Sequence, residues 1–208
     1  MSTTRKKPSI VYWLGNNLYL NVTNRCSNNC YFCFKRYKCG VSGFNLTLLE
    51  EPTPGQITDE LRTFLNRRKW KEVVFCGFGE PLERLDCVLE VTKWIKKRLP
   101  IAVRIDTNGQ ASLVNKGRNV IEELRQAGVD RLSVSLNAHD KETYNYVCKP
   151  EFEDAYENVI GFIEKAREQL DTEITTVTIP EVALSKVKET AHKMKVKFRL
   201  REYHPCFW

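Results

Sequence analysis

Six short apolar runs with the character of strands recur along the chain, and segments with helical periodicity separate them. Val, Ile, Leu and Phe dominate these runs, as expected of strands buried on one or both faces. An earlier apolar run, 10–14, precedes the turn sequence Gly15-Asn16-Asn17, so residues 9–22 are expected to form a hairpin-like pair of strands. The six expected strands cover residues 18–22, 72–76, 102–106, 131–136, 174–179 and 197–202.

Between the strands, apolar residues recur at spacings of three and four, the period of one helix face. Pro100 ends the second of these helices and Gly128 ends the third. Strand–helix alternation predicts an α/β fold with a parallel sheet, right-handed crossovers and outer helices. Periodicity does not decide between an open doubly wound sheet and a partial barrel. The expected helices cover residues 57–65, 85–95, 121–124, 152–170 and 184–194.

Polar or Gly-rich residues follow each expected strand, where both architectures place their functional groups. These groups are therefore expected to face one site. They are Cys26 after the first strand, Gly77-Phe78-Gly79-Glu80-Pro81 after the second, Thr107-Asn108-Gly109 after the third, Asn137 after the fourth, Pro180-Glu181 after the fifth and Tyr203-His204 after the sixth.

Three cysteines lie close together after the first strand. Cys26, Cys30 and Cys33 read C-x-x-x-C-x-x-C, and three such thiolates hold three irons of a [4Fe–4S] cluster while the fourth iron has no protein ligand. An open metal position is where a substrate or cofactor binds. The alternative is a zinc site with Cys39 as fourth ligand, although the scattered histidines supply no second ligand pair.

The composition is that of a soluble globular protein, with 208 residues, 42% hydrophobic and 28% charged. No linker or low-complexity tract divides it, so one domain over residues 1–208 is expected. No apolar stretch approaches the ~18 residues that span a bilayer, and no export signal is visible, which favours a cytoplasmic protein without a membrane partner. In a reduced compartment, clustered thiols indicate metal binding. Five further cysteines share no spacing and are expected to be packed or free thiols: Cys39, Cys76, Cys87, Cys148 and Cys206.

The net charge of +7 adds a weaker signal. Basic runs on helices are explained by a solvated face. Lys35, Arg36 and Lys38 differ, because they directly follow the cysteine segment and fit an anionic substrate such as a phosphate or nucleic acid.

The chain from about residue 18 to residue 203 resembles the radical S-adenosylmethionine (SAM) superfamily. The cysteine triplet after a first strand and Gly79-Glu80-Pro81 after a second carry the resemblance. It implies a partial (β/α)6 TIM-like barrel, which matches the strand count. Within the superfamily, the chain is similar to the short TatD-associated radical SAM proteins in four segments: Asn21-Val22-Thr23-Asn24-Arg25, Gly77-Phe78-Gly79-Glu80-Pro81, Ser135-Leu136-Asn137-Ala138 and Arg201-Glu202-Tyr203.

The resemblance implies a mechanism. The three thiolates hold a [4Fe–4S] cluster whose unique iron is chelated by SAM, and one electron cleaves SAM to methionine and a 5′-deoxyadenosyl radical. That radical abstracts hydrogen from an unidentified substrate, and SAM is either consumed or regenerated. The implied partners are a low-potential electron donor of the flavodoxin or ferredoxin type and a TatD-type hydrolase. The lateral opening of such a barrel also fits a macromolecular substrate. Cys148 and Cys206 are expected to be packed thiols; the alternative is that one of them donates its thiol hydrogen to a substrate radical.

Residue roles follow from the same resemblance. Phe32 is expected to lie against the adenine, or to be an ordinary core aromatic. The turn at Gly77 and Gly79 leaves backbone groups free for the SAM ammonium, although the family usually has two adjacent glycines there. Glu80 accepts from that ammonium or caps the following helix. Ile179 completes the adenine pocket or is a buried strand end.

Four further residues are implied as contacts of the SAM ribose or carboxylate. Asp106 and Asn108 occupy one strand end, and Ser135 and Asn137 occupy the next. The alternative for Asn108 is a turn role, because Asn-Gly is a strong turn dipeptide.

A rival class is a zinc or iron–sulfur nucleic-acid-binding module without catalysis. It explains the basic runs and uses the cysteines structurally. It does not explain Gly79-Glu80-Pro81 or Thr107-Asn108-Gly109.

Overall fold

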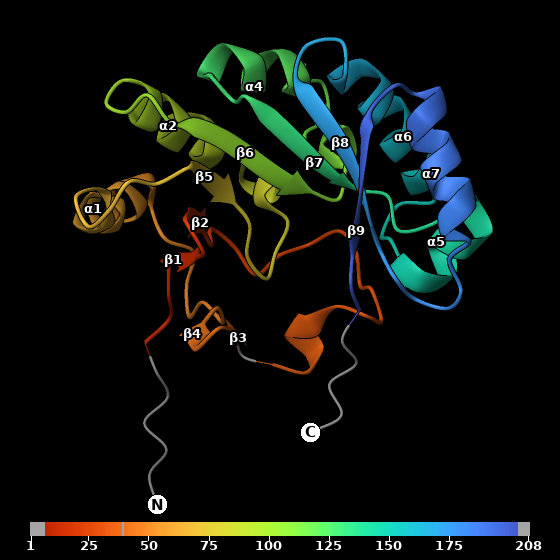
Figure 1. The fold of residues 1–208 in the computed structure, drawn as a ribbon, viewed down its shortest axis with the longest axis horizontal. Coiled ribbons are helices and arrows are strands. Elements are labelled where there is room, and N and C mark those ends of the chain that lie inside the picture. Colours follow the sequence, from red (N-terminus) through yellow and green to blue (C-terminus); the bar gives the residue numbers. More distant parts are fainter. Residues whose placement is uncertain (1–6, 39, 204–208) are drawn as a thin grey trace, which may run out of the picture.

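The computed structural model describes residues 7–38 and 40–203, and within them seven strands form one curved sheet. Six of the strands run parallel, and β1 pairs antiparallel with β2 at one edge. Figure 1 shows this sheet as an arc with the helices on its outer side and β9 at the far edge. The strands, in spatial order, are β1 (Val11–Leu14), β2 (Asn17–Leu20), β5 (Glu72–Phe75), β6 (Ala102–Thr107), β7 (Arg131–Ser135), β8 (Asp171–Val177) and β9 (Lys197–Arg201).

The expected partial (β/α)6 barrel is confirmed, and the expected hairpin of residues 9–22 is the β1–β2 pair. A second small hairpin, β3 (Gly40–Val41) with β4 (Phe44–Asn45), was not predicted, because two-residue strands leave no alternating pattern. The helices are α1 (Pro54–Leu65), α2 (Leu85–Lys96), α3 (Ala111–Val114), α4 (Val120–Ala127), α5 (Lys141–Cys148), α6 (Ala155–Ala166) and α7 (Leu184–Lys193), with 3₁₀ helices η1 (Phe34–Arg36) and η2 (Pro81–Arg84).

Two differences from the expected helices have local causes. The helix expected over 152–170 is shorter, because Phe152 and Leu170 join the core from the turns that flank α6. The helix α5 was not predicted, although its Asp140 cap accepts a hydrogen bond from the Thr143 N–H at 2.8 Å. Its apolar face is short and is built largely from tyrosine and cysteine rather than aliphatic residues.

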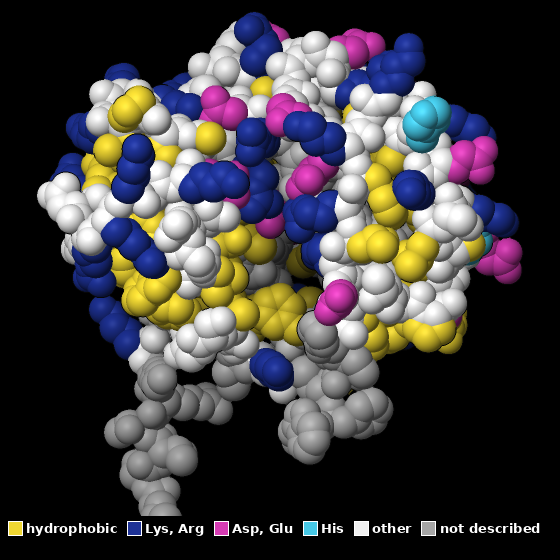
Figure 2. Space-filling model, viewed as in Figure 1, with side chains coloured by type: hydrophobic (Ala, Val, Ile, Leu, Met, Phe, Trp, Pro, Cys, Tyr) yellow, Lys and Arg dark blue, Asp and Glu magenta, His cyan; other side chains and the backbone are white. Residues whose placement is uncertain are grey.

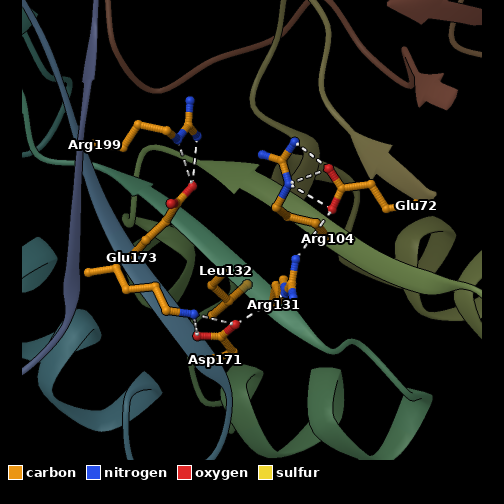
Figure 3. A pocket seen from close by; sticks show the side chains of 8 residues that line it. Glu72, Arg104, Arg131, Leu132, Asp171, Glu173 and Arg199 are labelled. Carbon is orange, nitrogen blue, oxygen red and sulfur yellow. Dashed lines mark hydrogen bonds and ion pairs between the residues drawn. The ribbon is translucent and has the colours of Figure 1, made fainter. Parts of the chain in front are cut away.

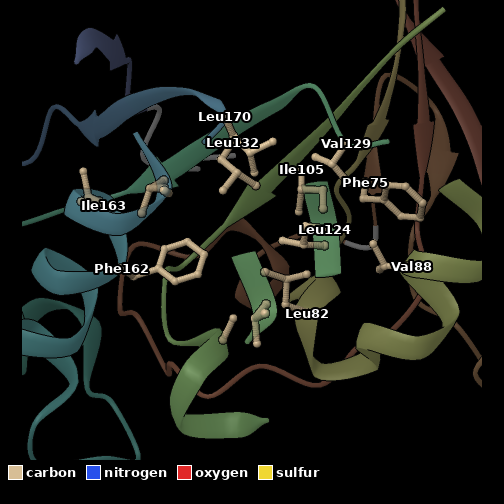
Figure 4. Close-up of a cluster of buried hydrophobic side chains, with 14 of the residues drawn as sticks. Phe75, Leu82, Val88, Ile105, Leu124, Val129, Leu132, Phe162, Ile163 and Leu170 are labelled. Atoms are coloured by element: carbon tan, nitrogen blue, oxygen red, sulfur yellow. The ribbon is translucent and has the colours of Figure 1, made fainter. Parts of the chain in front are cut away.

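The main core lies between the outer face of the sheet and the helices. Phe75, Ile105 and Leu132 come from three adjacent strands and are fully buried. Figure 4 shows them with Leu124 of α4 and Phe162 of α6 in the same cluster. Burial of this outer face fixes which residues of each strand point inward, because successive side chains alternate between the two faces. No helix among the described residues is long and apolar enough to cross a membrane.

The concave face carries charged side chains around a cavity of about 260 Å³. Glu72 lies 3.2 Å from Arg104, and Asp171 lies 3.1 Å from Arg131. Figure 3 shows these groups pointing toward one another, and in Figure 2 basic and acidic side chains lie next to each other on this part of the surface. The cavity lies toward the amino ends of the strands, away from the strand-end turns. Its lining is Glu72, Arg104, Arg131, Leu132, Asp171, Glu173, Lys197 and Arg199.

Candidate functional site

The cysteine segment, residues 21–33, crosses the carboxyl ends of the strands. It leaves β2 and is tied to the end of α5, where the Asn29 N–H donates to the Cys148 carbonyl at 2.9 Å and the Tyr31 N–H donates to the Val147 carbonyl at 3.2 Å. An isolated bridge pairs Asn28 with Pro150. In Figure 1 this segment runs below the arc of the sheet, from the β1–β2 edge toward the β9 side. The segment is therefore fixed at its middle as well as where it leaves the sheet.

The three thiols of this segment are free and half-buried. Burial raises the pKa of Cys26 to about 12 and also raises the pKa of Cys33. The pKa of Cys30 is instead lowered, because the buried Cys148 thiol donates a hydrogen bond to its sulfur. Metal binding requires thiolates, so loading of the site displaces protons from Cys26 and Cys33.

The donor set fits an iron–sulfur cluster. Three free thiols lie on one short segment. The Asn108 side-chain amide donates a hydrogen bond to the Cys26 sulfur at 3.8 Å, and hydrogen bonds of this kind orient metal ligands and adjust their affinity for the metal. Among the described residues, no three His, Cys, Asp or Glu side chains converge closely enough to hold one metal ion. In a cluster each thiolate binds a different iron, so such convergence is not required. Cys39, Cys206 and His204 lie outside the described residues.

Glu80 joins the two strand-end turns beneath this segment. One oxygen of its buried carboxylate accepts from the Leu82 N–H at 3.0 Å and from the Thr107 hydroxyl at 2.8 Å, and the other accepts from the Asn108 N–H at 2.6 Å. Burial raises the pKa of Glu80 to about 7 despite these bonds. Of the two roles expected for Glu80, the helix cap is present, since η2 begins directly after it.

Asn108 extends this connection to the cysteine segment. Its side-chain amide donates to the Ser27 hydroxyl at 2.9 Å as well as to Cys26, and its Oδ1 accepts from the Gln110 N–H at 2.9 Å. Gly109 follows with a positive φ of 80°, so the turn that was the alternative role of Asn108 is present. Asn108 therefore forms the turn and contacts the cysteine segment at the same time.

Three more buried polar side chains complete the network. Gln110 donates through Nε2 to Asn28 Oδ1 at 2.6 Å and to the Tyr144 hydroxyl at 2.8 Å. Asn28 donates to the same hydroxyl at 3.1 Å. We call Glu80, Thr107, Asn108, Ser27, Asn28, Gln110 and Tyr144 the strand-end network; all seven are buried.

Gly77 and Gly79 allow the two polypeptide segments to approach. A Cβ at Gly77 would lie 2.1 Å from Asn21 Oδ1, and a Cβ at Gly79 would lie 2.4 Å from the Arg25 carbonyl oxygen. The Glu80 N–H donates to that same carbonyl at 2.7 Å. Both glycines are thus required by the packing of the turn against the start of the cysteine segment.

The remaining expected contacts lie in two places. Asp106, Ser135 and Asn137 lie on the concave side, where Asp106 pairs with Arg104. Phe32 packs edge-on against Tyr31 and against the main core, and the buried Ile179 belongs to that core. The structure therefore groups Glu80 and Asn108 with Cys26, and it records no contact of Phe32 or Ile179 with that group among the described residues.

Sequence reasoning missed four members of the strand-end network: Ser27, Asn28, Gln110 and Tyr144. Ser27 and Asn28 lie inside the cysteine segment, and Gln110 follows the Asn-Gly turn, so proximity to a motif was the available signal. Tyr144 offered none, because the helix that carries it was not predicted. Arg201, which Asn137 and Ser135 contact, was noted only as part of a motif.

Tyr144→Phe tests the strand-end network. Loss of the hydroxyl leaves the buried amides of Asn28 and Gln110 each without one acceptor, so we expect the free energy of unfolding to fall by about 1–3 kcal/mol. Tyr146→Phe is the matched control on the same helix, since Tyr146 is 64% exposed. Denaturant unfolding measures both, and equal effects of the two substitutions would contradict the network.

Glu80→Gln tests the buried carboxylate through pH. Because burial raises the Glu80 pKa from 4.5 to about 7, the folded protein binds more protons than the unfolded chain between these values. The stability of the wild type relative to Glu80→Gln should therefore fall as pH rises through this window, by on the order of 3 kcal/mol. Urea unfolding over a pH series measures it. A wild-type advantage that is constant or increases with pH would rule out the raised pKa.

Comparison with known proteins adds to this geometry. The chain is 30% identical over 169 residues to a probable GTP 3′,8-cyclase of Methanocaldococcus jannaschii, covering 81% of this chain and 50% of that protein. It is 28% identical over 183 residues to an AdoMet-dependent heme synthase of Methanosarcina barkeri, covering 84% of this chain and 45% of the relative. The chain thus spans about half the length of the curated relatives it matches.

The fold also resembles solved structures at low identity. Streptococcus suis SuiB bound to the precursor peptide SuiA superposes with a TM-score of 0.70 at 16% identity, covering 93% of this chain and 40% of that chain. The model of the Radical SAM superfamily matches residues 20–194, a range that contains the cysteine triplet and all members of the strand-end network. The chain therefore belongs to the radical SAM superfamily.

Proposed function

We propose that this chain is a radical SAM enzyme in which Cys26, Cys30 and Cys33 hold a [4Fe–4S] cluster. The superfamily implies this cluster together with SAM. The observation that carries the proposal is the position of the three free thiols, on a segment fixed across the strand ends with Asn108 donating to the Cys26 sulfur. When bound, the cluster and SAM supply one-electron cleavage of SAM to methionine and a 5′-deoxyadenosyl radical that takes hydrogen from a substrate.

The chain's own residues position and shield this chemistry. The strand-end network holds the cysteine segment against the ends of β5 and β6, so the backbone that carries the thiols is fixed in position. Because the network is buried, it excludes water from the side of the site that faces the core. The Asn108 amide stabilises negative charge on the Cys26 sulfur by a hydrogen bond to it.

The SAM contacts remain part of the proposal. Phe32 and Ile179 would line the adenine pocket, and Gly77 and Gly79 would offer backbone groups to the SAM ammonium. Glu80 would serve mainly as the cap and clamp described above, because its oxygens already accept three hydrogen bonds. The concave-side residues Asp106, Ser135 and Asn137, together with Asn108 at the turn, would meet the ribose or carboxylate.

The partners follow from the family and the motifs. Radical SAM enzymes need a reductant, and we propose a low-potential flavodoxin or ferredoxin in the cytoplasm. The four motif segments similar to TatD-associated proteins support that subgroup and a TatD-type hydrolase as partner. Failure to detect the two-protein complex by native mass spectrometry would remove that partner. The proposed unit is a single domain over residues 1–208.

The nucleic-acid-binding module without catalysis is not favoured. Named relatives such as the probable GTP 3′,8-cyclase and the AdoMet-dependent heme synthase are enzymes. Within the described part of the chain, the cysteine segment belongs to a strand-end site of the kind that α/β barrels use for catalysis.

Anaerobic reconstitution tests the proposed function. With iron, sulfide, dithionite and SAM, the wild-type chain should show iron–sulfur absorption and form 5′-deoxyadenosine, detected by mass spectrometry. Cys30→Ala should lose both signals, because one of three cluster ligands is gone. Cys87→Ala is the control, since Cys87 is buried on α2, outside the cysteine segment, and should keep both. A wild-type chain that binds one zinc and no cluster would overturn the proposal.

A further inference from the structure

Among the described residues, the basic side chains of the concave face form ion pairs, with one exception. Arg104, Arg131, Lys197 and Arg199 each lie 3.2 Å or less from a carboxylate of the same face. Arg201, the last residue of β9, forms no ion pair with any described residue. Among the described residues, Arg201 is therefore the one cation of the concave face without an ion pair of its own, although the Asp106 carboxylate acts on it electrostatically.

Neutral groups hold the Arg201 guanidinium in place. Its Nη2 donates to the Ser135 hydroxyl at 3.1 Å and to Asn137 Oδ1 at 3.3 Å. Asn137 is itself fixed, because the same oxygen accepts from the Val177 N–H at 3.1 Å. The Arg201 Nε is buried without a hydrogen-bond partner in the described part of the chain. A positioned guanidinium with an unused donor is incomplete, because a buried donor without an acceptor costs about 1–3 kcal/mol.

Arg201 lies where a residue that binds substrate is expected, and not where the structural ion pairs of this face lie. It ends β9 at the carboxyl edge of the sheet, and it interacts electrostatically with Asp106, Cys76 and Cys30. Arg199, two residues earlier on the same face, lines the amino-end cavity and pairs with Glu173 at 2.7 Å. Burial lowers the pKa of Arg201, although the negative charge of Asp106 acts to raise it.

We propose that Arg201, held by Ser135 and Asn137, binds an anionic group of the substrate, a carboxylate or a phosphate. This inference rests on the proposed function, because only an enzyme has a substrate. Binding of an anion at Arg201 can nevertheless be measured without turnover. Nη2 already donates to Ser135 and Asn137, so the anion would be met by the free Nε donor and by the positive charge of the guanidinium. Ser135 and Asn137 then also position Arg201, in addition to the SAM contact proposed for them.

The test is calorimetric titration of the reconstituted 208-residue chain, without reductant, with inorganic phosphate and separately with malonate. We expect saturable binding of at least one anion, and a loss of about tenfold or more in affinity for Arg201→Gln, as for a hydrogen-bonded charge pair. Arg199→Gln is the matched control and should keep the wild-type affinity, because its charge is already paired. The anion that binds more tightly identifies the substrate group.

Three results would overturn the inference. The first is the absence of saturable anion binding to the wild type. The second is an equal loss of anion affinity in Arg199→Gln, which would show that only the net positive charge of the protein attracts the anion. A parallel fall in SAM affinity, or a shift of the cluster potential with unchanged anion binding, would assign Arg201 to the cofactors. Arg201→Lys keeps the charge, so it provides the comparison if Arg201→Gln does not fold. Failure of SAM cleavage with an intact anion site would count against the proposed function instead.

Discussion

The carboxylate of Glu80 is the constraint on which the site depends. A single buried side chain accepts hydrogen bonds from η2, from the end of β6 and from the Asn108 backbone, and Asn108 then reaches the cysteine segment. A buried carboxylate is costly unless its oxygens are satisfied, so this position strongly favours the turn conformation that supplies its donors. Gly77 and Gly79 permit the arrangement, because any Cβ there would meet the start of the cysteine segment.

The amino ends of the strands carry structural ion pairs, whereas the carboxyl ends carry the residues of the candidate site. Toward the amino ends, each basic side chain of the concave face is paired with a carboxylate, as expected of ion pairs with a structural role. Toward the carboxyl ends, the thiols lie free, and the Arg201 Nε has no hydrogen-bond partner among the described residues. Unsatisfied groups of this kind are retained where a ligand completes them, and in α/β barrels that edge of the sheet holds the active site.

The strands and the central chemistry could be predicted from sequence, whereas the partners of the site could not. Buried parallel strands are short apolar runs, and the residues that follow them are at the functional edge wherever the chain crosses over, so Cys26, Glu80 and Asn108 were identified. The contact between Asn28 and Tyr144 joins residues 116 apart, and that between Asn28 and Gln110 joins residues 82 apart. No local pattern encodes such pairs, because they depend on crossover geometry and strand register.

The strand-end network holds the cysteine segment in the position that we propose binds the cluster. The most direct measurement is the rate at which the reconstituted protein loses iron to a chelator after Gln110→Ala, a substitution outside the cysteine segment. We expect Gln110→Ala to lose iron about tenfold faster or more than the wild type, as for other residues that support metal ligands. Gln126→Ala, at an exposed position on α4, should leave the rate unchanged. Equal rates for Gln110→Ala and the wild type would show that the strand-end network does not hold the cysteine segment in place.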